Sequence, residues 1–133
     1  MIKAVADTHA VIWYLFQDKR LSAIAQATIA QIASVGDQVA FSTITLAEIL
    51  YLSERGRIAA DTLSHLFSAI TTQQAVLIDV PFHRDIALAM QQIDPAQVPE
   101  LPDRMIAATA LYLSVPVITR DHKIQASKIP TIW

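Results

Sequence analysis

The fold is organised around one short stretch near the start of the chain, Ile2-Lys3-Ala4-Val5-Ala6-Asp7-Thr8-His9. Apart from Lys3, this run is apolar as far as Ala6, and it ends abruptly at a carboxylate. A short apolar run that is followed at once by polar residues is typical of a buried strand. Asp7 then lies at the carboxyl end of that strand, which is the edge where open α/β sheets bind their ligands.

The composition places the chain among globular domains. It has 133 residues, of which 53% are hydrophobic and 17% are charged, and this argues against disorder. The length suits a single domain with a real core, which we expect to span residues 1–133. The absence of cysteine excludes a disulfide framework, a thiolate zinc site and a thiol nucleophile. A net charge of −2 argues against a general binder of polyanions.

No segment has the pattern of a membrane anchor. The longest unbroken apolar run, residues 10–16, is far shorter than the roughly 20 residues that a membrane-spanning helix needs. Asp7 and His9 also interrupt what would be the apolar region of a signal peptide. We therefore expect a cytoplasmic protein without a membrane partner.

Strands and helices are expected to alternate along the chain. Apolar runs predict further strands at 39–42, 76–78, 115–119 and 131–133. Helical spacing of apolar residues predicts helices at 8–17, 23–35, 45–55, 61–73, 82–93 and 103–114. Three prolines predict a loop over 94–102. The alternation predicts an α/β three-layer sandwich, with helices on both sides of a mostly parallel, four- to five-stranded sheet.

Four acids are expected to meet at one edge of this sheet. Right-handed crossovers bring the strand ends and the starts of the following helices to that edge, and with them Asp7, Glu48, Asp103 and Asp121. Each acid also has an ordinary explanation as a helix cap or turn residue, and Thr45-x-x-Glu48 matches a capping box. Taken together, however, converging carboxylates repel one another unless a cation lies between them. Oxygen-only ligands suit Mg²⁺ or Mn²⁺.

Four segments of the chain resemble the successive motifs of PIN-domain ribonucleases: Asp7-Thr8-His9, 42–49, 102–110 and 117–121. Their order, their spacing and the total length are similar to those of VapC toxins from bacterial toxin–antitoxin pairs, and the resemblance covers the whole chain. It implies a PIN-like fold and a Mg²⁺- or Mn²⁺-dependent endoribonuclease that leaves a 5′-phosphate and a 3′-hydroxyl. The implied partners are an RNA substrate, a cognate antitoxin and a second copy in a homodimer, each protein partner bound through exposed apolar surface.

The resemblance also assigns roles to individual residues. It implies that Asp7, Glu48, Asp103 and Asp121 are both the catalytic residues and the metal ligands. Thr119 matches a hydroxyl position of the family and would orient an acid or water. Glu100 stands three residues before Asp103, where one VapC-like subgroup often carries an acid.

Other polar and aromatic residues near the acids have two interpretations each. Thr8 could cap the first helix or lie near the metal. Arg104 and Arg120 flank two of the acids and could bind phosphate, or they could simply offset negative charge. Trp13 and Tyr14 could stack on bases or belong to the core.

Two other functions are compatible with a chain of this size and layout. A catalytically silent interaction module with the same fold should have lost one or more acids, and none of the four is missing. A phosphoacceptor receiver domain has a similar layout, and Asp79 does follow the third predicted strand. However, Asp7 lacks the acidic neighbour of a receiver, and the lysine expected after the next-to-last strand is absent.

Overall fold

In the computed structural model, which describes all 133 residues, β1 (Ile2–Ala6) is the central strand of a five-stranded sheet. β2 (Gln38–Ser42) and β3 (Leu77–Val80) lie on one side of it, and β4 (Val117–Ile118) and β5 (Thr131–Ile132) lie on the other. All four strand pairings are parallel. The predicted α/β fold is therefore confirmed, with the strand order β3-β2-β1-β4-β5.

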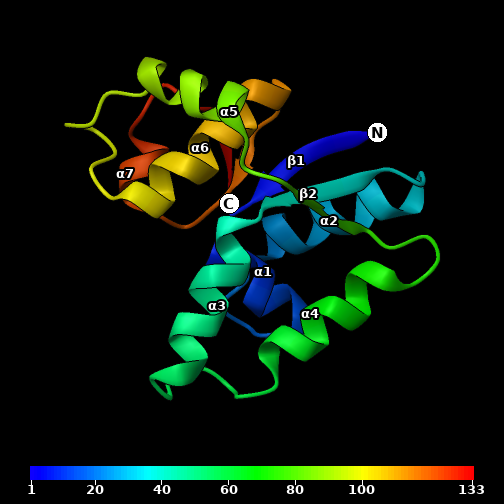
Figure 1. Cartoon of the computed structure of the whole chain (residues 1–133). Coiled ribbons are helices and arrows are strands. Elements are labelled where there is room, and N and C mark those ends of the chain that lie inside the picture. Colours follow the sequence, from blue (N-terminus) through cyan, green and yellow to red (C-terminus); the bar gives the residue numbers. More distant parts are fainter.

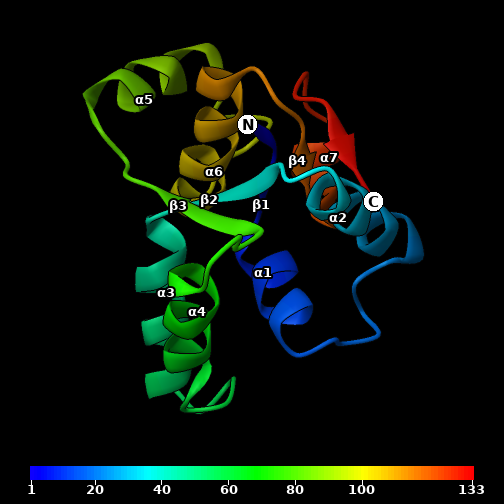
Figure 2. The ribbon, with the colours of Figure 1, turned by 90° about the vertical axis from the view of Figure 1, so that its right-hand side faces the viewer.

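Helices cover both faces of the sheet, as Figures 1 and 2 show from two directions. One face carries α1 (Thr8–Leu15), α2 (Ala23–Ser34), α3 (Ile44–Glu54) and α4 (Thr62–Thr71). The other carries α5 (Arg84–Ala89), α6 (Leu101–Leu113) and α7 (His122–Gln125), with the short 3₁₀ helix η1 (Met90–Gln92) after α5. None of the helices is both long and apolar enough to span a membrane.

A separate hydrophobic core lies on each face of the sheet, and the alternation of side chains along β1 explains why. Ala4 and Ala6 pack with the α1–α4 helices, whereas Val5 packs with the α5–α7 helices. All three side chains are at most 1% exposed. Successive side chains of a strand point to opposite faces, so a central strand covered on both faces must be apolar at every buried position.

The strand order argues against the receiver-domain alternative. Receiver domains have the flavodoxin-like order 2-1-3-4-5, in which the second strand is an edge strand. Here β2 lies between β1 and β3. Asp79 is not at a strand end either, because it is paired with Phe41 within β3.

Several predicted boundaries were wrong by a few residues, and three elements illustrate this. The strand predicted at 115–119 is only Val117–Ile118, because the Val115 amide still bonds to the Ala110 carbonyl at the end of α6. The helix predicted from 103 begins at Leu101, since a proline in the first turn loses no helical hydrogen bond. The helix predicted at 82–93 begins at Arg84 and ends as η1.

Candidate active site

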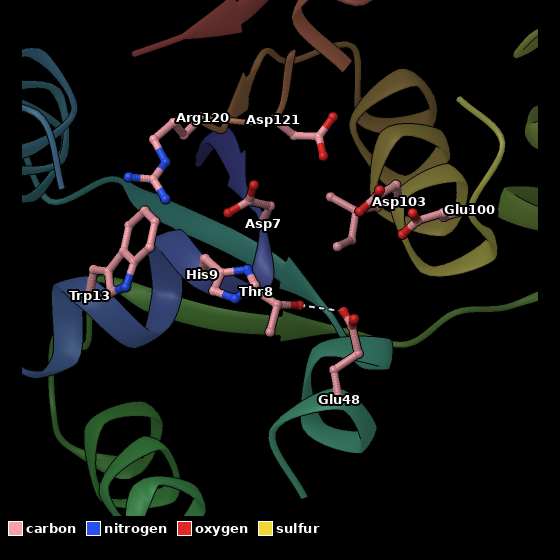
Figure 3. Close-up of a pocket in the computed structure, with 10 residues that line it drawn as sticks. Asp7, Thr8, His9, Trp13, Glu48, Glu100, Asp103, Arg120 and Asp121 are labelled. Atoms are coloured by element: carbon pink, nitrogen blue, oxygen red, sulfur yellow. Dashed lines mark hydrogen bonds between the residues drawn. The ribbon is translucent and has the colours of Figure 1, made fainter. Parts of the chain in front are cut away.

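A polar cavity of about 270 Å³ opens at the carboxyl edge of the sheet (Figure 3). Five acids line it: Asp7, Glu48, Glu100, Asp103 and Asp121. The other lining residues are Thr8, His9, Trp13, Ile106 and Arg120. The structure thus brings together the four acids that topology placed at this edge, and adds Glu100 to them.

Asp7 is both a helix cap and a wall of the pocket. One carboxylate oxygen, Oδ1, accepts a hydrogen bond of 2.8 Å from the Ala10 amide and so caps α1. The other oxygen, Oδ2, accepts a hydrogen bond from the Thr119 hydroxyl. Burial raises the pKa of Asp7, and these two hydrogen bonds act in the opposite direction. Asp7 is therefore an ordinary helix cap and, at the same time, a lining residue of the pocket.

Asp121 repeats this arrangement at the end of β4. Its Oδ1 accepts hydrogen bonds from the amides of Lys123 (2.9 Å) and Ile124 (3.0 Å), which caps α7. The Asp121 amide in turn donates to the Thr119 hydroxyl at 2.9 Å. Thr119 is fully buried and does not line the pocket. Its hydroxyl connects the Asp7 carboxylate to the Asp121 amide from outside the pocket. This is the position expected of a residue that orients the acids.

Glu48 is held by a tertiary contact and not by a capping box. Its Oε1 accepts a hydrogen bond of 2.5 Å from the Thr8 hydroxyl (Figure 3). The Thr8 hydroxyl also lies 2.9 Å from the Thr45 hydroxyl. Thr45 lies buried inside α3, whose N-cap position is Thr43, and no side chain forms a cap hydrogen bond there. The capping-box interpretation was therefore wrong. Thr8 does not cap α1 either, because Asp7 does.

Burial raises the pKa of Glu48, and the hydrogen bond from Thr8 opposes this rise. Asp103 shows a larger effect, because burial and then the charges of Asp121, Glu100 and Glu48 raise its pKa to about 7. Neither Asp103 nor Glu100 accepts a side-chain hydrogen bond within the protein, although both lie at the start of α6. Both lie at the end of α6 where the helix dipole favours a carboxylate.

The two candidate phosphate-binding arginines lie in different surroundings. Arg120 lines the pocket, with its guanidinium 4.5 Å from the centre of the Trp13 ring. Arg104 does not line the pocket, and its Nη2 donates to the carbonyls of Met90 (3.1 Å) and Ile93 (3.4 Å). That contact ties the start of α6 to η1, which is a structural role.

The aromatic candidates do not present free faces to the pocket. Trp13 is only 4% exposed, and guanidinium groups of Arg120 and Arg20 lie over its ring. Tyr14 lines a separate groove beside α2 and is absent from the acidic pocket. Base stacking is therefore not supported for either residue.

The donor set suits a hard divalent cation in its chemistry. Carboxylates supply all the anionic groups of the pocket, no thiolate is present, and oxygen donors are those that Mg²⁺ and Mn²⁺ prefer. A bound cation would also offset the repulsion from neighbouring carboxylates that, together with burial as the larger cause, raises the pKa of Asp103. The acids line the walls of the cavity, however, and no three of them lie close enough together to form a ready-made ion site.

Comparison with known proteins places the chain in a family. The PIN-domain model matches residues 4–129. The chain therefore belongs to the PIN-domain family, and the VapC-like resemblance of its motifs is confirmed. Over 139 aligned residues it is 29% identical to Ribonuclease VapC22 of Mycobacterium tuberculosis, with 100% of each chain covered.

Two solved structures share the fold. VapBC from Salmonella typhimurium, crystallised bound to DNA, matches with a TM-score of 0.72 at 21% identity. VapBC2 from Rickettsia felis, bound to a DNA fragment from its promoter, matches with a TM-score of 0.71 at 16% identity. In both cases 98% of this chain and 97% of the other are covered. At these sequence identities the similarity shows a shared fold and nothing further.

Proposed function

We propose that this protein is a metal-dependent endoribonuclease and the toxin of a toxin–antitoxin pair. One observation carries the proposal: five carboxylates from four separate segments of a PIN-family chain line a single pocket. A silent interaction module of the same fold would need none of these acids to stay together.

The proposed ligands of Mg²⁺ or Mn²⁺ are Asp7, Glu48, Asp103 and Asp121, with Glu100 beside them. When bound, the cation would activate water and neutralise charge that develops on the phosphodiester. The protein's part is to hold the acids. Thr119 and the caps of α1 and α7 fix Asp7 and Asp121, and Thr8 fixes Glu48. No protein nucleophile is required.

The proposed protein partners are a cognate antitoxin and a second copy of the chain. The Salmonella and Rickettsia relatives were crystallised as VapBC complexes. On the present chain, large apolar side chains remain exposed on α3, α4 and α5, among them Tyr51 (53%), Phe67 (46%) and Leu88 (59%). Exposed apolar groups of this size are suited to a protein interface. Light scattering at micromolar concentrations tests the homodimer, and a strictly monomeric species would contradict it.

The nuclease proposal is tested by incubating the purified protein with single-stranded RNA in millimolar Mg²⁺ and in EDTA. We expect cleavage only with Mg²⁺, and at least about a hundredfold slower cleavage by Asp7→Asn and Asp103→Asn, because each would remove a ligand. Glu48→Gln should behave in the same way, whereas Glu54→Gln, at the exposed far end of the same helix, should cleave normally.

Circular dichroism shows whether each variant is folded. Undiminished cleavage by a folded Asp7→Asn protein would contradict the proposed mechanism. A parent protein that cleaves no RNA but binds a partner protein would favour the silent module instead.

A further inference from the structure

Arg120 is a cation in an acidic pocket, yet it makes no ion pair. It is the only lysine or arginine among the lining residues. The ion pairs of the chain involve Met1, Arg20 and His65, so the guanidinium of Arg120 is not paired with any of the five acids. Figure 3 shows its side chain extending over Trp13, away from Asp103 and Glu100.

The Trp13 ring that supports Arg120 is itself held on several sides. Its centre lies 5.5 Å from the ring of His9 and 5.9 Å from the ring of Trp133. The guanidinium of Arg20 lies 5.2 Å from it, and Asp18 accepts two hydrogen bonds from that group, at 3.1 and 2.7 Å. An indole fixed in this way is a rigid support for a second cation.

The contact with Trp13 keeps two opposite charges apart inside one pocket. A free guanidinium would be drawn to the nearest carboxylate, and each would then block the other. Over the indole ring, Arg120 is held by the ring face and keeps its N–H donors unpaired. None of the five carboxylates that line the pocket forms an ion pair with Arg120. The pocket therefore has an anionic part and, at one side, a single cationic anchor.

We propose that Trp13 is a positioning residue that holds Arg120 as the anchor for an RNA phosphate next to the bond that is cut. This inference rests on the proposed nuclease function. The planar fork of a guanidinium matches the oxygens of a phosphate, and Arg120 has no competing partner. Arg20 contributes little charge to this anchor, because Asp18 already neutralises it. The ligand is the phosphate backbone and not a base, since the indole is covered.

RNA binding tests the proposal separately from cleavage. Fluorescence anisotropy of a labelled single-stranded RNA oligonucleotide is measured in millimolar Mg²⁺ over a range of salt concentrations. All proteins carry Asp7→Asn, so that affinity is read without cutting. The variants added to this background are Arg120→Gln, Trp13→Leu, Trp13→Phe and the two Arg120→Gln/Trp13 double variants. Arg57→Gln, an exposed arginine beyond the end of α3, is the matched control.

Arg120→Gln should weaken RNA binding about tenfold, as expected for one lost charge-assisted hydrogen bond. The slope of log affinity against log salt should fall by about 0.7, the value for one phosphate contact to a single strand. Trp13→Leu should weaken binding in the same direction, and Trp13→Phe less, because phenylalanine keeps a ring face. In the Arg120→Gln background neither Trp13 substitution should have a further effect. Arg57→Gln should leave both quantities unchanged.

Two results would overturn the proposal. One is Arg120→Gln binding RNA as well as the Arg57→Gln control does. The other is a Trp13 substitution that weakens binding by the same factor in both backgrounds, which would show that the indole acts independently of Arg120. If Trp13→Leu does not fold by circular dichroism, the Trp13→Phe cycle decides by the same comparison. A parent that cuts RNA while Arg120→Gln binds it normally leaves the nuclease function standing and removes only the anchor.

Discussion

The two walls of the acidic pocket are held in different ways. On the wall formed by the ends of β1 and β4, Asp7 and Asp121 each accept hydrogen bonds from backbone amides, and Thr119 connects them. On the wall formed by the start of α6, Asp103 and Glu100 accept no side-chain hydrogen bond. The first wall is fixed by the fold, and the second carries charges that the fold does not satisfy.

The pKa shifts follow the same division. Burial raises the pKa of Asp7, but hydrogen bonds from Thr119 and Ala10 oppose the rise. For Asp103 burial and four neighbouring carboxylates all act in one direction. An acid that also serves as a cap stabilises the fold without any ligand. An unsatisfied acid destabilises it, so the wall formed by α6 should respond most to pH and to a cation.

Among changes that leave all five acids in place, the largest effect is expected from removing the hydroxyl that joins the two acids of the fixed wall. Thr119→Val leaves the Asp7 carboxylate and the Asp121 amide without their shared partner. Loss of such a supporting contact should lower Mg²⁺-dependent cleavage by roughly 10- to 100-fold, while Thr119→Ser should retain most of it. Thr109→Val is the control, since that buried hydroxyl bonds only to the Met105 carbonyl. Equal cleavage by Thr119→Val and Thr109→Val would show that the contact does not matter.

An intermediate effect is expected on the thermal stability of two Asp7 variants. Comparing them separates the contribution of the helix cap from that of the negative charge. Asp7→Ala removes the acceptor for the Ala10 amide, which typically destabilises by about 0.5–2 kcal/mol. Asp7→Asn keeps an oxygen acceptor and removes the charge that repels the other acids. In EDTA, thermal melts should therefore place Asp7→Asn at or above the parent and Asp7→Ala below Asp7→Asn. Ser22→Ala, which loses the equivalent cap of α2, gives the scale for a cap without a pocket. Asp7→Asn melting at or below Asp7→Ala would contradict the repulsion.

The smallest effect should be a pH dependence of the free energy of unfolding. It arises from Asp103, in the wall formed by α6. Folding raises the pKa of Asp103 from an ordinary 3.8 to about 7. Between these values the folded protein binds a proton that the unfolded chain has released, so this group makes stability fall as pH rises from about 4 to 7. Solvent screening limits the size of the effect, because Asp103 is only half-buried. Urea unfolding in EDTA at several pH values should show a steeper fall in the parent than in Asp103→Asn. Parallel curves would contradict the shift.

Much of the fold could be predicted because its pattern is local. Apolar runs and helical spacing indicated strands and helices in the right order. The strand order could not be obtained in this way, since a buried parallel strand is apolar on both faces whichever strand lies beside it. The ends of short elements were misplaced for a different reason: they depend on single hydrogen bonds at a helix terminus, such as the bond from the Val115 amide to the Ala110 carbonyl.

The site was predictable to the extent that it follows from topology. Acids at strand ends and helix starts must share one edge, and Asp7, Glu48, Asp103 and Asp121 do line one pocket. What escaped prediction depends on packing between distant segments. The Thr45-x-x-Glu48 pattern pointed to a local cap, whereas a threonine from another helix holds that glutamate. The contact between Trp13 and Arg120 likewise has no signature in the spacing of the two residues.

The pairing of β1 with β4 has a consequence for how the protein is made. One edge of β1 is paired by β2, but the other is closed only by residues near the opposite end of the chain, and the bond from Thr119 to Asp7 spans 112 positions. At roughly 5–20 residues per second, the ribosome needs on the order of ten seconds to reach β4 after it has made β1. Throughout that interval the nascent chain exposes an open strand edge and carries an Asp7 without its hydroxyl partner. Whatever the pocket does, it can begin only after β4 has been made.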